Sequence, residues 1–461
     1  MGKILFIFIA LIFCYNIIVQ KNEKKLYWYF AGILLFPSAI LISVSPLVSF
    51  ERLIMYTLLY VYLTNRQGLT SLNTIFPFKI PMIILFVLLL CVGIFDSRIV
   101  LFQKFYRPII YYLESFFVFY LTYTYLRTLK DFFKVVRFLL NLFLVFALYG
   151  LFNYAFKTSP YHDFIFATYG GINLVSIALQ GTLDERSRIS SFVWHPIYYG
   201  FLLSVAIQLM LFVQAVSSQI TLFSRRRIIM ITILLVSNLL LVNSRTPIAA
   251  LAVGLLFSFI FSASLASKFK IIFGGAILIL IIMTFVPNRF DIIEKTANVF
   301  TSKSSQLAGS SIEMRETQLL ASLFIFYQQP LTGNGYNYIQ EDLGFTTDVD
   351  ERNSDSDFEG FESYGYKLLI EQGLCGIVGN LILFTSLITW LIRKRATVNL
   401  IGKKLIILGI AFLCTFFLFI FGTGDMRSFP VFMSIMGIIF KAVSLCIKND
   451  HLTGDSAKRP L

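Results

Sequence analysis

Charged residues are scarce in this sequence. Only 14% of its 461 residues are Asp, Glu, Lys or Arg, whereas soluble domains carry about a quarter. A hydrophobic fraction of 57% accompanies this scarcity. Together the two values exclude an ordinary soluble protein and predict a single membrane domain over residues 1–461. The net charge of +14 is typical of basic loops that set membrane topology, so we expect no nucleic-acid partner.

Patterns for metals and disulfides are missing as well. The five cysteines lie singly in apolar segments without C-x-x-C spacing, so we expect neither disulfides nor a thiolate metal site. The three histidines, His162, His195 and His451, form no cluster with one another or with carboxylates. We therefore expect no zinc and no other cofactor. His162 lies beside Asp163 in a hydrophilic segment, and we expect its side chain to be exposed.

Long apolar runs are abundant and predict an all-α, polytopic membrane protein. A spanning helix needs about 20 apolar residues. With one shorter run, the sequence predicts about 12 to 13 transmembrane helices. The first is a retained helix rather than a signal peptide, because no small-x-small cleavage site precedes Lys21. The predicted spans are 4–20, 26–47, 51–64, 80–96, 108–126, 134–156, 192–214, 228–243, 247–265, 270–287, 364–392, 404–421 and 429–447.

The basic clusters predict the orientation of these spans. Alternating the spans keeps the clusters on one side of the membrane, which should be cytoplasmic. The two long hydrophilic segments, 157–191 and 288–362, then form outer loops, together with the short connection 243–246. The clusters are Lys21/Lys24/Lys25, Arg127/Lys130/Lys134, 225–227, Lys268/Lys270, 393–395 with Lys403 and Lys404, and the C-terminal tail.

Arg315, in the large outer loop, runs against this bias. Ser310 and Glu313 have capping-box spacing, and an amphipathic run continues to Tyr327, so the sequence predicts a helix here. Arg315 would lie in the first turn, where a cation opposes the helix dipole. A bound anion would reverse that effect. The alternative is an exposed arginine paired with Glu316 or Glu313.

Two further arginine positions belong to the outer side. Arg245 follows a predicted span, with Thr246 as a plausible N-cap and Pro247 suited to the first helical position. Its alternative role is an anchor that snorkels to the interface. Arg188, with Arg186 nearby, ends the first outer loop; its alternative is an interfacial arginine beside an aromatic belt.

Arginines that converge on one face fit a phosphate or diphosphate, because the guanidinium fork matches phosphate oxygens and stays charged. We predict catalytic roles for Arg245 and Arg315, and contacts to diphosphate or sugar from Arg186 and Arg188. Further predicted substrate contacts are His195, Tyr199 and Asn334. For His195, at the start of a predicted span, the alternative is a purely structural role.

The acidic stretch that closes the large loop has two possible meanings. Its segments Asp348-Val-Asp350 and Asp355-Ser-Asp357 match the D-x-D pattern of metal-dependent sugar-nucleotide transferases. Sugar nucleotides are cytoplasmic, however, and the loop is expected outside, so a solvated acidic loop is the better interpretation. Glu362 differs because it stands where the loop meets the next span. We predict that Glu362 is the catalytic base.

Four segments resemble those of a known family in their order and spacing. The sequence over roughly 185–380 resembles the O-antigen polymerase/O-antigen ligase superfamily of bacterial envelope glycosyltransferases. The segments are RISSFVWHPIYYG (188–200), LLLVNSRTPIAAL (239–251), SSIEMRETQLLASLFIFYQQPLTGNGYNYI (310–339) and ESYGYKLLIEQGLCGIVG (362–379).

The resemblance implies a metal-independent, GT-C-like enzyme of the bacterial inner membrane. Its donor would be an oligosaccharide on undecaprenyl diphosphate at the periplasmic face, and Arg188, Arg245 and Arg315 would match the family arginines that hold the diphosphate. In the ligase branch a histidine ends the large loop, whereas Glu362 and Ser363 stand here. This difference favours a polymerase of O-antigen, capsular or exopolysaccharide repeat units.

Two alternatives stay open. One is a ligase that transfers glycan to the lipid A core of lipopolysaccharide or to protein. The other is a flippase or transporter of lipid-linked sugars, which would carry paired repeats around a midplane cavity. No internal repeat is visible in the sequence. For the polymerase we expect a chain-length regulator and a flippase as partners.

Overall fold

The computed structural model describes residues 2–37, 40–43, 48–64, 76–170, 187–262, 312–344, 363–424 and 426–447, together with 175, 179–180, 273 and 361. Helices account for most of these residues, and the described part contains one two-stranded hairpin. Six described helices are long and apolar enough to cross a membrane, and two shorter apolar helices accompany them. The prediction of an all-α, polytopic membrane protein is confirmed.

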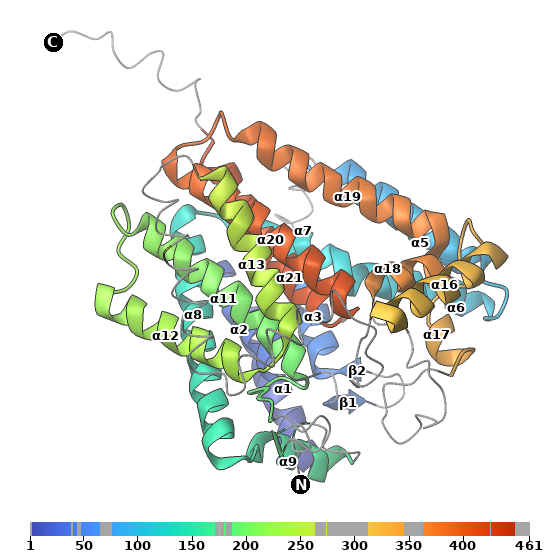
Figure 1. Cartoon of the computed structure of the whole chain (residues 1–461), viewed down its shortest axis with the longest axis horizontal. Coiled ribbons are helices and arrows are strands. Elements are labelled where there is room, and N and C mark those ends of the chain that lie inside the picture. Colours follow the sequence, from blue (N-terminus) through green and yellow to red (C-terminus); the bar gives the residue numbers. More distant parts are fainter. Residues whose placement is uncertain are drawn as a thin grey trace.

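The N-terminal elements are α1 (Gly2–Val19), α2 (Asn22–Leu35), β1 (Leu41–Ser43), β2 (Val48–Ser49), α3 (Phe50–Thr64), α5 (Lys79–Phe95), α6 (Leu101–Tyr112), the π-helix η1 (Leu113–Phe117), α7 (Val118–Tyr125), α8 (Leu129–Phe156) and α9 (Pro160–Tyr169). Among them, α1, α2 and α3 contact one another, whereas α5 lies along the C-terminal α19 (Gly373–Lys394; Figure 1).

The C-terminal elements include α11 (Pro196–Val216), the most buried of the six candidate membrane spans among the described residues. Its neighbours α13 and α20 pack closely against each other. The remaining elements are α12 (Arg225–Leu241), α13 (Arg245–Phe261), α16 (Ile312–Gln328), α17 (Tyr338–Glu341), α18 (Tyr364–Lys367), the π-helix η3 (Leu368–Gln372), α19 (Gly373–Lys394), α20 (Leu400–Thr423) and α21 (Ser428–Leu445).

The predicted span 26–47 is wrong in its second half. Helix α2 ends at Leu35, and the chain continues as the hairpin, in which Leu41 pairs with Ser49. Proline explains the end of the helix, because Pro37 disfavours helical geometry at the preceding residue. Phe36 is accordingly extended, with φ −117° and ψ 106°. The predicted span 270–287 lies outside the described residues, apart from Phe273.

Segment 157–191 is not a plain loop, and His162 is not exposed. The segment contains α9, and the side chain of His162 is completely buried. The hydroxyl of Ser159 lies 2.7 Å from His162 Nδ1, and the ring of Tyr161 packs 5.3 Å from that of Phe192. Burial lowers the pKa of His162 to about 4, because a low-dielectric surrounding disfavours the charged imidazolium.

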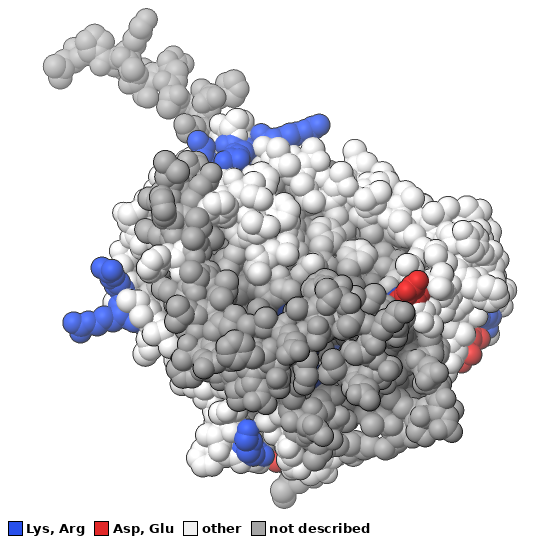
Figure 2. Space-filling model, viewed as in Figure 1, with Lys and Arg blue, Asp and Glu red and all other residues white. Residues whose placement is uncertain are grey.

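Basic clusters meet at one end of the bundle. Lys404, near the start of α20, donates to the carbonyl of Ala215 near the end of α11. Arg395 donates to the carbonyl of Phe261, where α13 ends. In Figure 2 many of the visible Lys and Arg side chains lie along the upper and left edges, whereas acidic side chains are seen at the right. The candidate site lies at the opposite ends of α11, α13 and α20.

Candidate functional site

The site is built around the beginning of α13. Its N-cap is Ser244, whose backbone is extended with φ −125° and ψ 132°. The predicted N-cap, Thr246, is therefore wrong, and Pro247 is the third helical residue rather than the first. Proline is tolerated there because the first-turn N–H groups have no partner within the helix. Arg245 opens the helix and is exposed.

The end of α20 brings Arg315 to this helix start. A Cβ on Gly422 would lie 3.0 Å from the Thr246 methyl group, so the two backbones approach closely. The carbonyl oxygen of the same Gly422 accepts a hydrogen bond of 3.0 Å from Arg315 Nη2. Thr246 and the Arg315 side chain thus meet at one residue of α20, and this contact brings the Arg245 and Arg315 segments together.

Arg188 reaches the same region through the end of α12. The backbone N–H of its neighbour, Ile189, donates to the carbonyl of Leu241, the last residue of α12, at 3.5 Å. From Leu241 the chain runs over three residues into Arg245. Three arginine-bearing segments that are far apart in the sequence therefore converge here. We call residues 187–189, 241–246, 315 and 422–424 the arginine corner.

Helix α18 adds two polar side chains that the sequence analysis missed. The Tyr366 hydroxyl donates to the backbone carbonyl of Arg315 at 3.1 Å. Lys367 Nζ donates to the carbonyl of Gly424 at 3.0 Å, where α20 ends in a left-handed residue with φ 62°. Cations at a helix C-terminus interact favourably with its partial negative charge. A signal was present, since Lys367 is the only basic residue in the segment 362–379.

The alternative proposed for Arg315 can now be examined. No ion pair joins Arg315 to Glu316, and among the described residues no carboxylate lies in ion-pair contact with it. Its guanidinium is held by a neutral carbonyl instead. A neutral carbonyl orients the guanidinium without cancelling its charge. The alternative pairing with Glu313 stays untested, because that side chain lies outside the described residues.

A small pocket contains residues on either side of the sequence-predicted His195. It combines one carboxylate and one guanidinium with a tryptophan, and its lining residues are Ile33, Leu34, Pro37, Glu51, Val193, Trp194, Tyr198 and Arg427. His195 itself caps α11, since its Nδ1 accepts from the N–H of Ile197 at 3.3 Å. This geometry favours the structural alternative for His195.

Tyr199 is placed inside the protein. Its side chain is completely buried. The hydroxyl lies 2.9 Å from Asn238 Oδ1 and 3.1 Å from the carbonyl oxygen of Phe146. It thereby ties α11 to α8 and α12. A direct contact between Tyr199 and substrate stays a prediction.

Asn334 belongs to a stretch that pairs through main-chain atoms with the end of η3 and the start of α19. Its N–H donates to the carbonyl of Ile370 at 2.8 Å, and the N–H of Gly335 donates to that of Glu371 at 3.0 Å. In return, Leu374 and Cys375 donate to the carbonyls of residues 330 and 331, each at 2.9 Å. We call this pairing of 330–335 with 370–375 the seam.

The π-helix η3 and two glycines make the seam possible. A π-turn offsets the helical hydrogen-bond ladder by one residue and leaves backbone groups for other partners. A Cβ on Gly333 would lie 2.5 Å from the nitrogen of Gln372, and one on Gly373 would lie 2.5 Å from the nitrogen of Gly333. The two backbones can approach this closely only because neither residue has a side chain.

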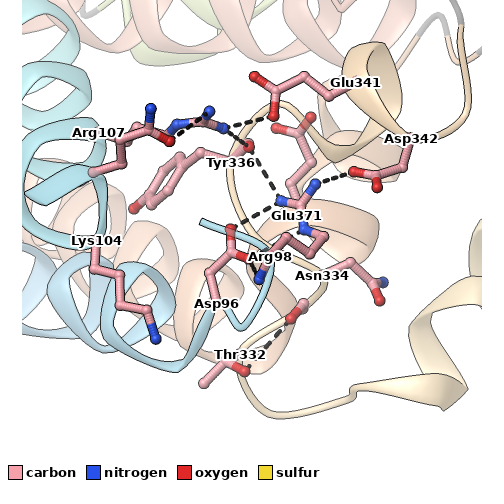
Figure 3. A network of polar contacts seen from close by, with 12 residues as sticks. Asp96, Arg98, Lys104, Arg107, Thr332, Asn334, Tyr336, Glu341, Asp342 and Glu371 are labelled. Carbon is pink, nitrogen blue, oxygen red and sulfur yellow. Dashed lines mark hydrogen bonds and ion pairs between the residues drawn. The ribbon is translucent and has the colours of Figure 1, made fainter. Parts of the chain in front are cut away.

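A network of ion pairs connects the large outer loop to the α5–α6 connection (Figure 3). Arg98 binds Asp96 through Nε and Nη2, at 3.1 and 2.9 Å, and also pairs with Asp342. Arg107 pairs with Glu341 at 2.8 Å. Both arginines donate to the carbonyl of Tyr336. We call Asp96, Arg98, Arg107, Glu341 and Asp342 the latch.

The latch corrects one prediction about the acidic stretch. Its first two members, Glu341 and Asp342, are paired with arginines rather than simply solvated. The rest of the stretch, including both D-x-D segments and the predicted base Glu362, lies outside the described residues, as does Arg186. The latch arginines were missed in the sequence, although Arg98 and Arg107 follow a span whose end is expected on the outer side.

These features define an integral membrane protein with a cationic corner at one end of its helices. Residues 230–381 match a family model described as O-antigen ligase. No curated protein matches the chain. The matched region contains Arg245, Arg315, Lys367 and the seam. The chain therefore carries an O-antigen ligase family domain, and its resemblance to the O-antigen polymerase/ligase superfamily is confirmed.

Proposed function

We propose that this protein is a polymerase that joins oligosaccharide repeat units carried on undecaprenyl diphosphate. The observation that carries the proposal is the arginine corner, which unites the segments of Arg188, Arg245 and Arg315. Two of these arginines lie inside the matched family domain. The family supports a glycosyltransferase-like enzyme of O-antigen-related polysaccharide biosynthesis. The polyprenyl donor, its sugar and the periplasmic orientation belong to the proposal.

The chemistry requires stabilisation of a leaving group more than it requires a metal. When the donor is attacked, the bond between the anomeric carbon and the diphosphate oxygen breaks, and negative charge grows on the diphosphate. Preorganised cations at that position each contribute several kcal/mol, about 3 to 4 for a well-placed donor group. Arg315 suits this task, since its guanidinium is oriented by a carbonyl and retains its charge.

The acceptor sugar needs a base. Its hydroxyl oxygen forms the new bond to the anomeric carbon, and its proton must go to a nearby group. Glu362 is our candidate, and a positioned carboxylate contributes about 10²–10⁴-fold. Direct attack on the donor inverts the anomeric configuration. Retention in the product linkage would contradict this mechanism.

A ligase is the second candidate, and the description of the matching family favours it. Deletion of the gene in its host distinguishes the two functions. Loss of a polymerase leaves single repeat units attached to the surface lipid, whereas loss of a ligase leaves the surface lipid without any. Complementation with the wild-type chain should restore long polymer. If the surface lipid carries no repeat units after deletion, the protein is a ligase and the polymerase proposal is wrong.

The orientation has its own test. Topology reporters fused after residues 188, 245 and 315 should all report the periplasmic side, and a reporter after residue 395 should report the cytoplasm. Reporters that place Arg245 and Arg315 on opposite sides of the membrane would contradict the arginine corner as a single site.

A further inference from the structure

Helix α16 exposes a row of large apolar side chains, although it lies in a loop predicted to be hydrophilic. Leu320, Phe324, Tyr327 and Leu331 recur at intervals of four, three and four residues, which places them on one helical face and its extension. Phe324 is 71% exposed and Tyr327 is 76% exposed. Soluble surfaces rarely carry such a contiguous row without a partner. We call these four residues the α16 stripe.

Helix α16 is amphipathic, with the stripe on its exposed face and polar residues on its buried face. On the opposite face Gln318 and Ser322 are completely buried, and Arg315 binds the end of α20. The exposed face itself changes character along its length. It begins with Glu316 and Thr317, both exposed and polar. From Leu320 to Tyr327 its exposed side chains are large and apolar, and exposed Gln328 and Gln329 follow before Leu331. A helix with such a division is suited to lie in a membrane interface.

The stripe is continuous with a surface that must face lipid. Helix α19 belongs to the candidate membrane span Tyr364–Lys394, and Leu374, Val378 and Leu381 are exposed along it. The seam joins the two surfaces, because Cys375 donates to the carbonyl of Leu331 at 2.9 Å. Exposed Leu331 therefore adjoins exposed Leu374, and one apolar surface runs from the span onto α16.

We propose that α16 is an interfacial helix whose stripe is inserted among lipid acyl chains, in the bilayer leaflet on the side of the arginine corner. Its occupant is membrane lipid rather than water or another protein, because Leu331 at the end of the stripe adjoins Leu374 on the lipid-facing side of α19. This inference does not depend on the reaction proposed above. It assigns to the large outer loop a membrane contact that was not predicted from the sequence.

Photo-crosslinking tests the proposal directly. The photoreactive amino acid p-benzoylphenylalanine replaces Phe324 in the full chain, which is reconstituted in phosphatidylcholine vesicles and irradiated. We expect mass spectrometry to find phospholipid adducts on the peptide that contains position 324. The same substitution at Leu381, which is 63% exposed on α19, is the positive control. The same substitution at Thr317, on the polar part of the exposed face, is expected to give at least tenfold fewer lipid adducts.

A second probe at Tyr327 guards against a local effect at position 324, and it should also give lipid adducts. Crosslinks from both positions to a second copy of the chain would show a protein interface and overturn the proposal. Crosslinks to another segment of the same chain would also overturn it. So would lipid adducts at Leu381 with none at Phe324 and Tyr327, which would leave α16 in water.

Discussion

The arginine corner and the latch both hold cations near α16 and α18, but they hold them differently. In the latch, Arg98 and Arg107 are matched by carboxylates. In the corner, Arg315 and Lys367 donate to carbonyl oxygens at the end of α20. A carboxylate cancels a guanidinium charge, whereas the partial charge of a helix end only orients it. The latch arginines are thus paired with carboxylates, whereas Arg315 is held by a carbonyl in the region where we propose that an anion binds.

The two regions also differ in their relation to the matched family domain. The corner draws Arg245, Arg315 and Lys367 from inside residues 230–381. The latch joins Glu341 and Asp342, inside the domain, to Asp96, Arg98 and Arg107, which lie outside it. The latch thus couples the N-terminal helices to the family domain. Disrupting it should reduce stability, whereas disrupting the corner should reduce activity.

The largest effect is expected from Arg315→Ala. Removing a charge that stabilises the transition state should lower polymer formation by about 10³-fold, while the thermal midpoint in detergent changes little. Arg315→Lys should rescue poorly because a point charge lacks the guanidinium fork. The measurement is polymer length and amount in a deletion strain, at matched protein levels. Normal chain length with Arg315→Lys would reduce its role to simple charge.

The matched change in the latch is Asp96→Asn, and its effect should fall on stability. The Asp96 side chain is completely buried and binds Arg98 through both oxygens. Loss of the carboxylate leaves a partly buried guanidinium with only the exposed Asp342 as a counter-charge, at a cost of about 3 kcal/mol. Thermal unfolding in detergent measures the change. An unaltered thermal midpoint together with lost activity would show that the latch acts in catalysis rather than in stability.

His162 lies in neither the latch nor the arginine corner, but it contributes to the loss of stability in acid. Its contribution must be known before acid unfolding can be used to compare the two regions. Its folded pKa of about 4 lies below the usual value of about 6.5, so the unfolded chain binds the extra proton first. The stability is present above the unfolded pKa and is lost as the pH falls toward 4. Between about pH 7 and pH 5 the loss should be about 2 kcal/mol.

The variant His162→Gln should flatten this part of the pH profile, and His451→Gln should leave it unchanged. The measurement is the unfolding midpoint in detergent at each pH. A wild-type slope that persists in His162→Gln would assign the acid sensitivity to other groups.

The smallest effect is expected from Asp342→Asn, at the rim of the latch. Its side chain is 40% exposed, and exposed ion pairs contribute about 0 to 1 kcal/mol because water and salt screen them. The thermal midpoint should therefore shift much less than with Asp96→Asn, and added salt should reduce the difference further. A loss as large as that of Asp96→Asn would show that the whole latch acts as one cooperative unit.

Local sequence signals predicted the helices well. Helix α8 ends at Phe156 as predicted, but it begins at Leu129, before the predicted start of the span at residue 134, behind a capping box in which Thr128 and Asp131 bond reciprocally. The convergence of the arginine segments also followed from the alternation of spans. The latch could not be predicted in this way, because Arg98 and Asp342 are 244 residues apart and no local pattern marks them as partners. The burial of His162 likewise depends on packing against distant segments.

The seam limits how the molecule can open. Four main-chain hydrogen bonds join residues 330–335 to residues 370–375. Gly333 and Gly373 allow the two backbone segments to come into contact, because they have no side chains. Because these hydrogen bonds are made by main-chain atoms, we expect side-chain substitutions elsewhere to weaken the seam little. We therefore expect any separation of the large outer loop from the helices to begin where α16 meets α20, a contact made by the side chain of Arg315.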